Sequence, residues 1–159
     1  MKRTVKMIWT GVLAAGIFAS VNIANAKEEK EKQLGKKDVP ATVLAAFEKA
    51  YPKAVAKGYS REEKDGKAFY EIESLEGKTH RDVSFLEDGS VIETEEVVAV
   101  KSLPEAVREA VKKDHPKGMF LRAEKISRGT TVEYEVIVTQ GKKKTEVKLD
   151  ALGKVLETE

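Results

Sequence analysis

Acidic side chains and one histidine recur at alternate positions near the middle of this 159-residue chain: Glu71, Glu73, His80 and Asp82. If the segments before and after the turn at Gly77 pair as antiparallel strands, all four side chains share one face of a sheet. Carboxylates and imidazole are ligands for divalent ions, so a metal or small-ligand site is one interpretation. The spacing matches no established metal-binding loop, and nearby basic residues fit a charged solvent face. We therefore expect no metal and no cofactor.

Residue types that carry out catalysis are sparse. The chain has no cysteine and two histidines, His80 and His115. None of the serines lies in a Gly-x-Ser-x-Gly elbow, and neither histidine has the sequence context of a catalytic triad. His115 is expected at the end of a helix, where a surface histidine is stabilised by the helix dipole. We therefore predict that the protein is not an enzyme.

Composition excludes further classes of protein. Zero cysteine rules out disulfides, thiolate metal sites and a lipid-modified N-terminal cysteine. The 29 basic and 27 acidic residues give a formal charge of +2. Nucleic-acid binding needs a concentrated basic footprint, so no nucleic-acid partner is expected. The length suits one domain, or two very small ones that share a core.

The first 26 residues have the pattern of an export signal. A basic start, an apolar run and a small-x-small motif follow one another: Lys2, Arg3 and Lys6, then residues 7–21, then Ala24-Asn25-Ala26. The apolar run is shorter than the roughly 20 residues that a membrane span needs. We predict a Sec-type signal peptide cleaved after Ala26, and a product without a membrane span in the periplasm or outside the cell. Residues 27–37 are charge-dense and are predicted to form a solvated tether.

The rest of the chain is a tandem sequence repeat of two copies. A shift of 64 residues aligns residues 39–95 with 103–159 without a gap. The identities include prolines, turn glycines and core positions, such as Pro40/Pro104, Pro52/Pro116, Tyr70/Tyr134, Val83/Val147, Gly89/Gly153 and Glu93/Glu157. Two copies make a tandem pair rather than a solenoid. We place one unit at residues 38–96 and the other at 97–159.

The predicted fold class is α+β. Each unit opens with a helix, capped by Asp38 or Ser102 and stopped by Pro52 or Pro116. Four antiparallel strands follow as a meander, in the first unit near residues 55–63, 68–75, 79–86 and 91–100. No glycine or proline interrupts residues 91–102, so the last strand is expected to run on into the second unit. Both helices are then expected on one face of a joined sheet, over a shared core.

Period-two alternation assigns the two faces of this sheet. Apolar residues that include Ile72, Val83, Val136 and Val147 form the core face. The opposite face is charged, with a few apolar residues among the charges, and its candidate binding residues are Phe69, Glu71, Glu73, Leu75, His80, Asp82, Glu133, Glu135 and Ile137. Aromatic anchors within a polar rim are typical of protein-docking surfaces. Scattered surface apolar residues without a partner are the other interpretation.

Several motifs recur in both units: Val39-Pro40 and Leu103-Pro104, Tyr51-Pro52 and His115-Pro116, Tyr70-Glu71-Ile72 and Tyr134-Glu135-Val136, and Asp88-Gly89-Ser90-Val91 and Gly153-Lys154-Val155. In these repeated motifs the chain resembles the PepSY-like family of secreted bacterial proteins. Its expected architecture is also similar to that of the beta-lactamase inhibitory proteins, whose sheet face grips a partner enzyme, although those proteins carry disulfides. The shared residues specify a fold rather than a chemistry, and the resemblance supplies no catalytic residues.

The function expected from the sequence is therefore that of an exported, non-enzymatic binding or inhibitor-type module. It would engage another envelope or secreted protein through the open sheet face. The alternative is a periplasmic metal or small-ligand sensor that uses the acidic part of the same face. The sequence leaves the partner and the oligomeric state undecided.

Overall fold

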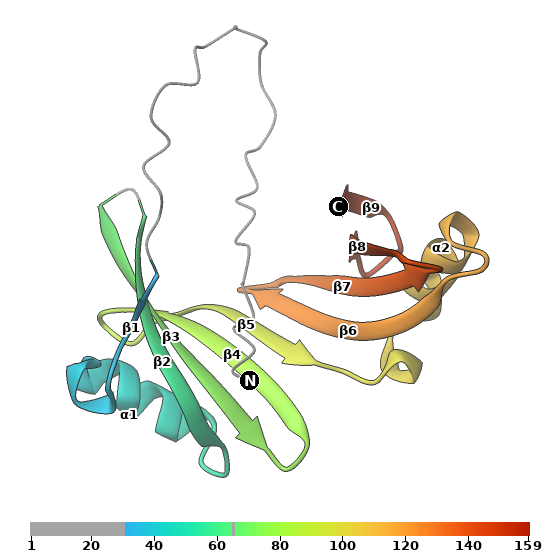
Figure 1. Ribbon diagram of the computed structural model, residues 1–159. Helices are drawn as coiled ribbons and strands as arrows, with labels where there is room; N and C mark the ends of the chain where they lie inside the picture. The colour runs from blue at the N-terminus through green and yellow to red at the C-terminus, as the bar shows by residue number, and fades with distance from the viewer. Residues whose placement is uncertain (1–30, 65) are drawn as a thin grey trace, which may run out of the picture.

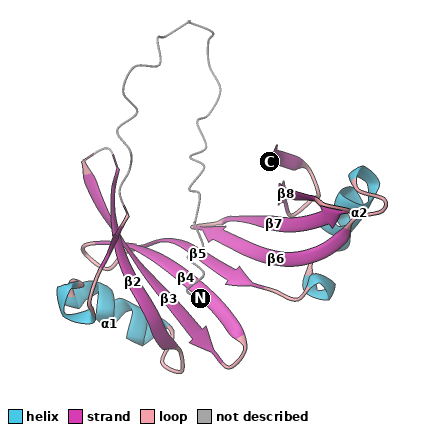
Figure 2. Cartoon of the chain, viewed as in Figure 1, coloured by secondary structure: helices cyan, strands magenta, loops and turns pink. Residues whose placement is uncertain are grey.

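The computed structural model describes residues 31–64 and 66–159. Over these residues the chain forms two helices and one nine-stranded antiparallel sheet, with the strands side by side in chain order (Figures 1 and 2). The predicted α+β class is confirmed. The predicted signal peptide and its cleavage site lie outside the described residues.

The bounds of the main elements recur after 64 residues, except at the end of the last strand of each half. The first half contains α1 (Ala41–Ala50), β2 (Val55–Lys64), β3 (Lys67–Glu76), β4 (Thr79–Leu86) and β5 (Val91–Val97). The second half contains α2 (Glu105–Asp114), β6 (Met119–Arg128), β7 (Thr131–Gln140), β8 (Lys143–Asp150) and β9 (Val155–Thr158). A short strand, β1 (Lys32–Gln33), and two 3₁₀ turns, η1 (Lys36–Asp38) and η2 (Val100–Ser102), complete the described chain.

Both helices begin at a proline and not at the predicted caps. Pro40 and Pro104 occupy the N-cap positions, and no side chain caps either helix. Asp38 and Ser102 instead end the preceding 3₁₀ turns, so the predicted caps do not form. The physical reason is that each proline is extended at the helix entrance, with ψ of 137° and 145°, which separates the predicted cap from the first helical turn.

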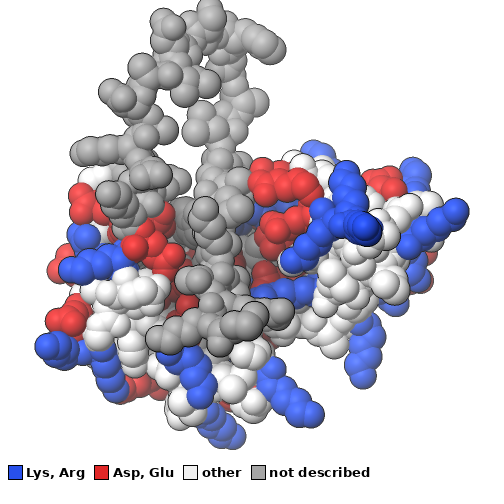
Figure 3. All heavy atoms as spheres, in the orientation of Figure 1, with Lys and Arg blue, Asp and Glu red and all other residues white. Residues whose placement is uncertain are grey.

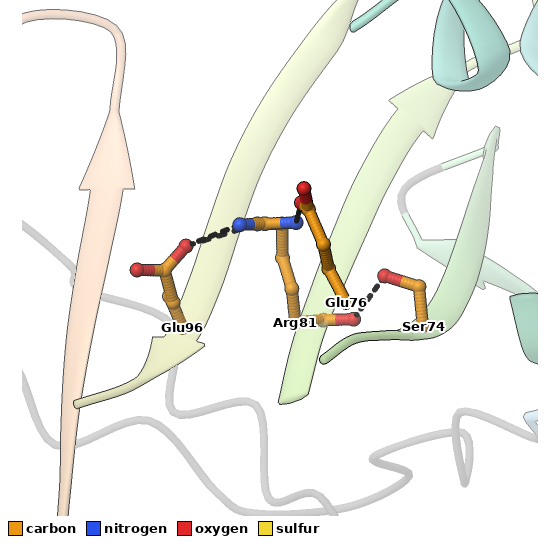
Figure 4. Close-up of polar contacts among 4 residues, drawn as sticks. All are labelled: Ser74, Glu76, Arg81 and Glu96. Atoms are coloured by element: carbon orange, nitrogen blue, oxygen red, sulfur yellow. Dashed lines mark hydrogen bonds and ion pairs between the residues drawn. The ribbon is translucent and has the colours of Figure 1, made fainter. Parts of the chain in front are cut away.

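Arg81 on β4 contacts the C-terminal end of α1, and Figure 4 shows its polar contacts with Ser74, Glu76 and Glu96. Its guanidinium carbon lies 4.4 Å from the ring centroid of Tyr51, the C-cap residue of α1. Arg81 Nη2 donates to Glu96 on β5 at 2.7 Å, and Nη1 donates to Glu76 on β3 at 3.2 Å. The Ser74 hydroxyl donates to the Arg81 carbonyl at 3.0 Å. Three strands are therefore tied to one helix end by charge and by a cation–π contact.

The buried apolar residues form two clusters, one under each helix. The first contains Val39, Val43, Phe47, Tyr70, Ile72, Val83 and Phe85. The second contains Leu103, Val107, Val111, Ala123, Val136, Val138, Val147 and Leu149. The predicted core face is confirmed, but the expectation of one shared core is wrong. The helices lie at opposite ends of the sheet, too far apart to cover the same strands (Figure 1).

The sheet is continuous because β5 pairs with β6, over Thr94–Val97 and Glu124–Ser127. The expected strand over residues 91–100 ends at Val97, and the chain leaves the sheet through η2. The halves are thus joined by hydrogen bonds between neighbouring strands and not by a strand that runs on. The predicted tether also differs, since Lys32–Gln33 pairs with β2 as an edge strand.

Candidate functional site

The face of the sheet that the helices leave uncovered is called the open face here. The register fixes its composition, because side chains directly opposite in neighbouring strands share a face. Asp82 on β4 lies opposite Glu73 on β3 and Glu95 on β5. In the next row, Ser84 lies opposite Glu71 and Glu93. Carboxylates therefore occupy adjacent rows across three strands.

All nine residues predicted from the sequence lie on the open face, in two groups. The register places the first group on β3 and β4 and the second on β7: Phe69, Glu71, Glu73, Leu75, His80 and Asp82, then Glu133, Glu135 and Ile137. β5 and β6 separate the groups. Glu73 and His80 are exposed, whereas the apolar residues Phe69, Leu75 and Ile137 are half-buried. The role of these nine residues in binding stays a prediction.

The strands between the two groups contribute side chains that the candidate set did not include. Glu93, Glu95, Glu124 and Ile126 lie on the open face, and Glu93 and Ile126 are each 1% exposed. Alternation along residues 91–97 was a usable signal for Glu93 and Glu95. The contribution of Glu124 was not visible in the sequence, because it depends on the pairing of β5 with β6.

Burial and mutual repulsion raise the pKa values of these carboxyls. Burial is the first cause for each, followed by neighbouring carboxylates. The pKa reaches about 8 for Glu71, about 6 for Asp82, about 9 for Glu95 and about 7 for Glu135. The open face therefore holds several carboxyl groups whose protonation changes around neutral pH.

Two arginines of β6 neutralise part of this charge. Arg128 Nε forms an ion pair with Glu93, and Arg128 Nη1 donates to Glu133 on β7 at 2.7 Å. Arg122 forms an ion pair with Glu124. Glu93 also shares a side-chain hydrogen bond with Glu95 on the same strand. In the space-filling view, acidic and basic side chains are interspersed on the visible face (Figure 3).

The metal-site interpretation rested on Glu71, Glu73, His80 and Asp82. Glu73 is directly opposite Asp82, but His80 is opposite Leu75, and Glu71 lies a row away from Asp82. Within residues 31–64 and 66–159, no three His, Asp or Glu side chains are arranged so that they could hold a metal ion. His115 is the C-cap of α2 and so does not belong to the open face.

No helix in the described part of the chain is both long enough and apolar enough to cross a membrane.

Comparison with solved structures identifies the fold. A DUF2874 family protein from Bacteroides ovatus is 21% identical, with a TM-score of 0.61 over 77% of this chain and 88% of that chain. A BLIP-like protein from Bacteroides fragilis is 22% identical, with a TM-score of 0.59 over 76% and 85%. A protein from Bacteroides eggerthii that is assigned to the periplasm is 18% identical, with a TM-score of 0.65 over 76% and 88%. No curated protein sequence matches the chain.

A family profile matches most of the sequence, well beyond the repeated motifs. The profile of the beta-lactamase-inhibitor-like, PepSY-like family matches residues 24–78 and 69–157. These two matches extend over both helices and nearly all of the described strands. They confirm the resemblance seen in the repeated motifs, and the chain belongs to the beta-lactamase-inhibitor-like, PepSY-like family.

Proposed function

We propose that this protein is a non-enzymatic binding module that engages another envelope or secreted protein through its open face. The observation that carries the proposal is the surplus of acidic over basic side chains on this face, whose carboxyl pKa values are raised by burial and repulsion. A complementary partner surface would relieve that repulsion. Half-buried Phe69, Leu75 and Ile137 would supply apolar contacts within the charged face.

Further support comes from the family description and from the kinds of protein that share the fold. The family is described as beta-lactamase-inhibitor-like, and one structural neighbour is BLIP-like. We propose in addition that the chain consists of two PepSY-like units, at residues 38–96 and 97–159. We also propose that it is exported by a signal peptide cleaved after Ala26. Mass spectrometry of the mature protein would then give Lys27 as its first residue.

Cross-linked pull-down from the periplasm, with a matched pair of variants, tests the binding function. Glu71→Lys/Glu73→Lys places two positive charges on the open face, and Glu105→Lys/Glu109→Lys places two on exposed positions of α2. We expect the wild type and the α2 variant to recover the same protein and the open-face variant to lose it. Equal recovery by all three would exclude the open face.

A purified complex completes the test, because recovery from a mixture does not prove direct contact. The recovered protein is titrated against both variants by calorimetry, and hydrogen exchange should show protection of β3, β4 and β5. Parallel titrations with Ca²⁺, Zn²⁺ and Cu²⁺ examine the alternative of a metal sensor. Saturable metal binding without a protein partner would favour that alternative.

A further inference from the structure

Six lysines gather at one end of the second half of the sheet: Lys112, Lys113, Lys117, Lys142, Lys143 and Lys144. Here α2 ends, β6 begins and β7 turns into β8 (Figure 1). The register brings these segments together, because Thr139 on β7 lies opposite both Met119, the first residue of β6, and Lys144 on β8. In the turn that connects α2 to β6, the Gly118 N–H donates to the His115 carbonyl at 2.9 Å. These six lysines are called the basic end here.

The basic end has almost no compensating negative charge. All six lysines are exposed, and none forms an ion pair with another residue in the described part of the chain. Asp114 is the one acidic residue within residues 112–117 and 140–144. The dipole of α2 favours Lys112 and Lys113 in its last turn, but it does not account for the three lysines of the β7–β8 segment. The surplus of like charge is therefore complementary to an anionic surface.

The first half of the chain shows that the fold does not require this charge. Its helix end and its β3–β4 turn occupy the corresponding places, 64 residues earlier. The residues there are Glu48, Lys49, Lys53, Lys78, Thr79 and His80. Three lysines and one glutamate give a formal charge of +2, against +6 for the six lysines of the basic end. The same helix end and turn thus form with much less positive charge.

An independent observation is that apolar side chains are exposed beside the lysines. Met119 and Leu121 on β6 are 67% and 55% exposed. Met119 shares a sheet face with Lys144, through Thr139. Leu121 is the extra residue where the β6–β7 register shifts. Exposed apolar residues flanked by lysines are typical of protein surfaces that lie on anionic membranes, where the lysines meet headgroup phosphates and the apolar side chains enter the acyl boundary.

We propose that the basic end, with Met119 and Leu121, docks on the surface of an anionic phospholipid bilayer. The lysines would contact the headgroup phosphates, and the two apolar side chains would lie at the boundary with the acyl chains. A nucleic acid also offers phosphates, but it has no apolar layer to cover Met119 and Leu121. The inference goes beyond the proposed function and does not rest on it, because Glu71 and Glu73 lie in the other half of the sheet.

The charge contribution is tested by co-sedimentation with vesicles of equimolar phosphatidylglycerol and phosphatidylcholine. The protein is used in its mature form, whose first residue is established by the mass spectrometry described above. Lys142→Gln/Lys143→Gln/Lys144→Gln should weaken binding at least tenfold, since each lysine near an anionic bilayer adds to the attraction. Lys49→Gln/Lys53→Gln/Lys78→Gln removes the same charge from exposed positions of the first half and should change binding less than threefold. Binding should also weaken as the salt concentration rises, and vesicles of phosphatidylcholine alone should not bind.

The apolar contribution is tested with a fluorescent label. The chain has no cysteine, so one introduced cysteine carries the dye at a chosen position. Met119→Cys with an environment-sensitive dye should shift its emission to the blue when the phosphatidylglycerol vesicles are added. Val55→Cys places the dye at the corresponding position of the first half, which is 57% exposed, and should show no shift. Met119→Gln/Leu121→Gln should weaken vesicle binding at least threefold, whereas Val55→Gln/Leu152→Gln, at two exposed positions elsewhere, should leave it unchanged.

Several outcomes would overturn the membrane surface. Wild-type protein that does not bind the phosphatidylglycerol vesicles, or binds phosphatidylcholine equally well, would exclude it. Equal losses in the two triple lysine variants would assign binding to net charge alone. Equal dye responses at positions 119 and 55 would exclude docking through the basic end, even if a lysine variant failed to fold. Binding of inorganic polyphosphate as tight as that of vesicles, without a dye shift, would make the basic end a site for soluble anions. The pull-down with Glu71→Lys/Glu73→Lys tests the open face separately.

Discussion

Arg128 on β6 and Glu93 on β5 form an ion pair across the strand pairing that joins the two halves of the sheet. Arg128 also donates to Glu133 on β7, so one guanidinium connects three strands at the junction. The two apolar clusters lie under separate helices and do not merge there. Electrostatic contacts on the open face therefore reinforce a junction that the apolar core does not bridge.

Removal of Arg128 should destabilise the protein strongly, because it leaves Glu93 as a buried charge without a counterion. For Arg128→Met we expect a loss of about 3–5 kcal/mol in the free energy of unfolding, measured by urea denaturation. Arg128→Met/Glu93→Gln should regain most of that loss. Lys36→Met breaks an exposed pair with Glu48 and should cost less than about 1 kcal/mol. A double variant no more stable than Arg128→Met would argue against the pairing.

Stability should fall as the pH rises from about 5 to about 9. The raised carboxyl pKa values mean that the folded protein binds more protons than the unfolded chain in this window. Their contribution is complete below the unfolded pKa, about 4.5, and is lost as the pH passes the folded values. The free energy of unfolding should therefore fall by an amount on the order of a few kcal/mol, and the melting temperature should decrease by several degrees. Glu95→Gln should flatten this dependence. A melting temperature that rises toward pH 9 would contradict the prediction.

Binding of a cationic peptide should release protons. At pH 7 Glu71 is largely protonated, since its pKa is about 8, and the groups that face it are Glu31, Glu62, Glu73 and Asp82. A bound ammonium group favours the carboxylate and so lowers the pKa. Calorimetry of pentalysine binding in buffers of different ionisation enthalpy should detect the released protons, and affinity should increase from pH 6 to pH 9. Glu71→Gln should reduce both effects, and a heat independent of buffer would count against them.

Gly153 should be far less tolerant of alanine than Gly141, although both have positive φ, 80° and 64°. A Cβ at Gly153 would lie 2.5 Å from the Ala106 carbonyl oxygen of α2, whereas a Cβ at Gly141 would meet nothing within 4 Å. Gly141→Ala should cost about 1–2 kcal/mol from backbone strain alone. Gly153→Ala should cost clearly more, because α2 must also move. Equal losses in thermal unfolding would show that the contact with α2 is unimportant.

Arg81 should contribute more to stability than an exposed ion pair of the same type. Arg81→Met removes the contacts with Glu76, Glu96 and the Tyr51 ring, and we expect a loss of about 1–3 kcal/mol. Hydrogen exchange should increase at the end of α1. Lys36→Met breaks an exposed pair with Glu48 and serves as the control, with a change of about 0.5 kcal/mol or less. Similar effects of the two variants would remove the special role of Arg81.

The sequence by itself determined the local elements and the two faces of the sheet. Proline and glycine positions mark the ends of the helices and the turns. Alternation around Ile72 and Val83 separates the core face from the open face. Both signals are readable from the sequence because they act over a few residues. The caps at Asp38 and Ser102 failed because an extended proline separates each from its helix. The repeat also predicted where the helices end.

Tertiary structure alone decided what lies at the centre of the open face. The pairing of β5 with β6 brings Glu93 beside Arg128 and Glu95 near Glu124, and no local pattern encodes that register. It also decided that the apolar residues form two clusters, since the helices cover opposite ends of one sheet. Raised carboxyl pKa values follow from this long-range packing, because burial and repulsion depend on neighbours distant in sequence. The sequence could name acidic residues for the face, but only the fold shows which of them lack a counterion.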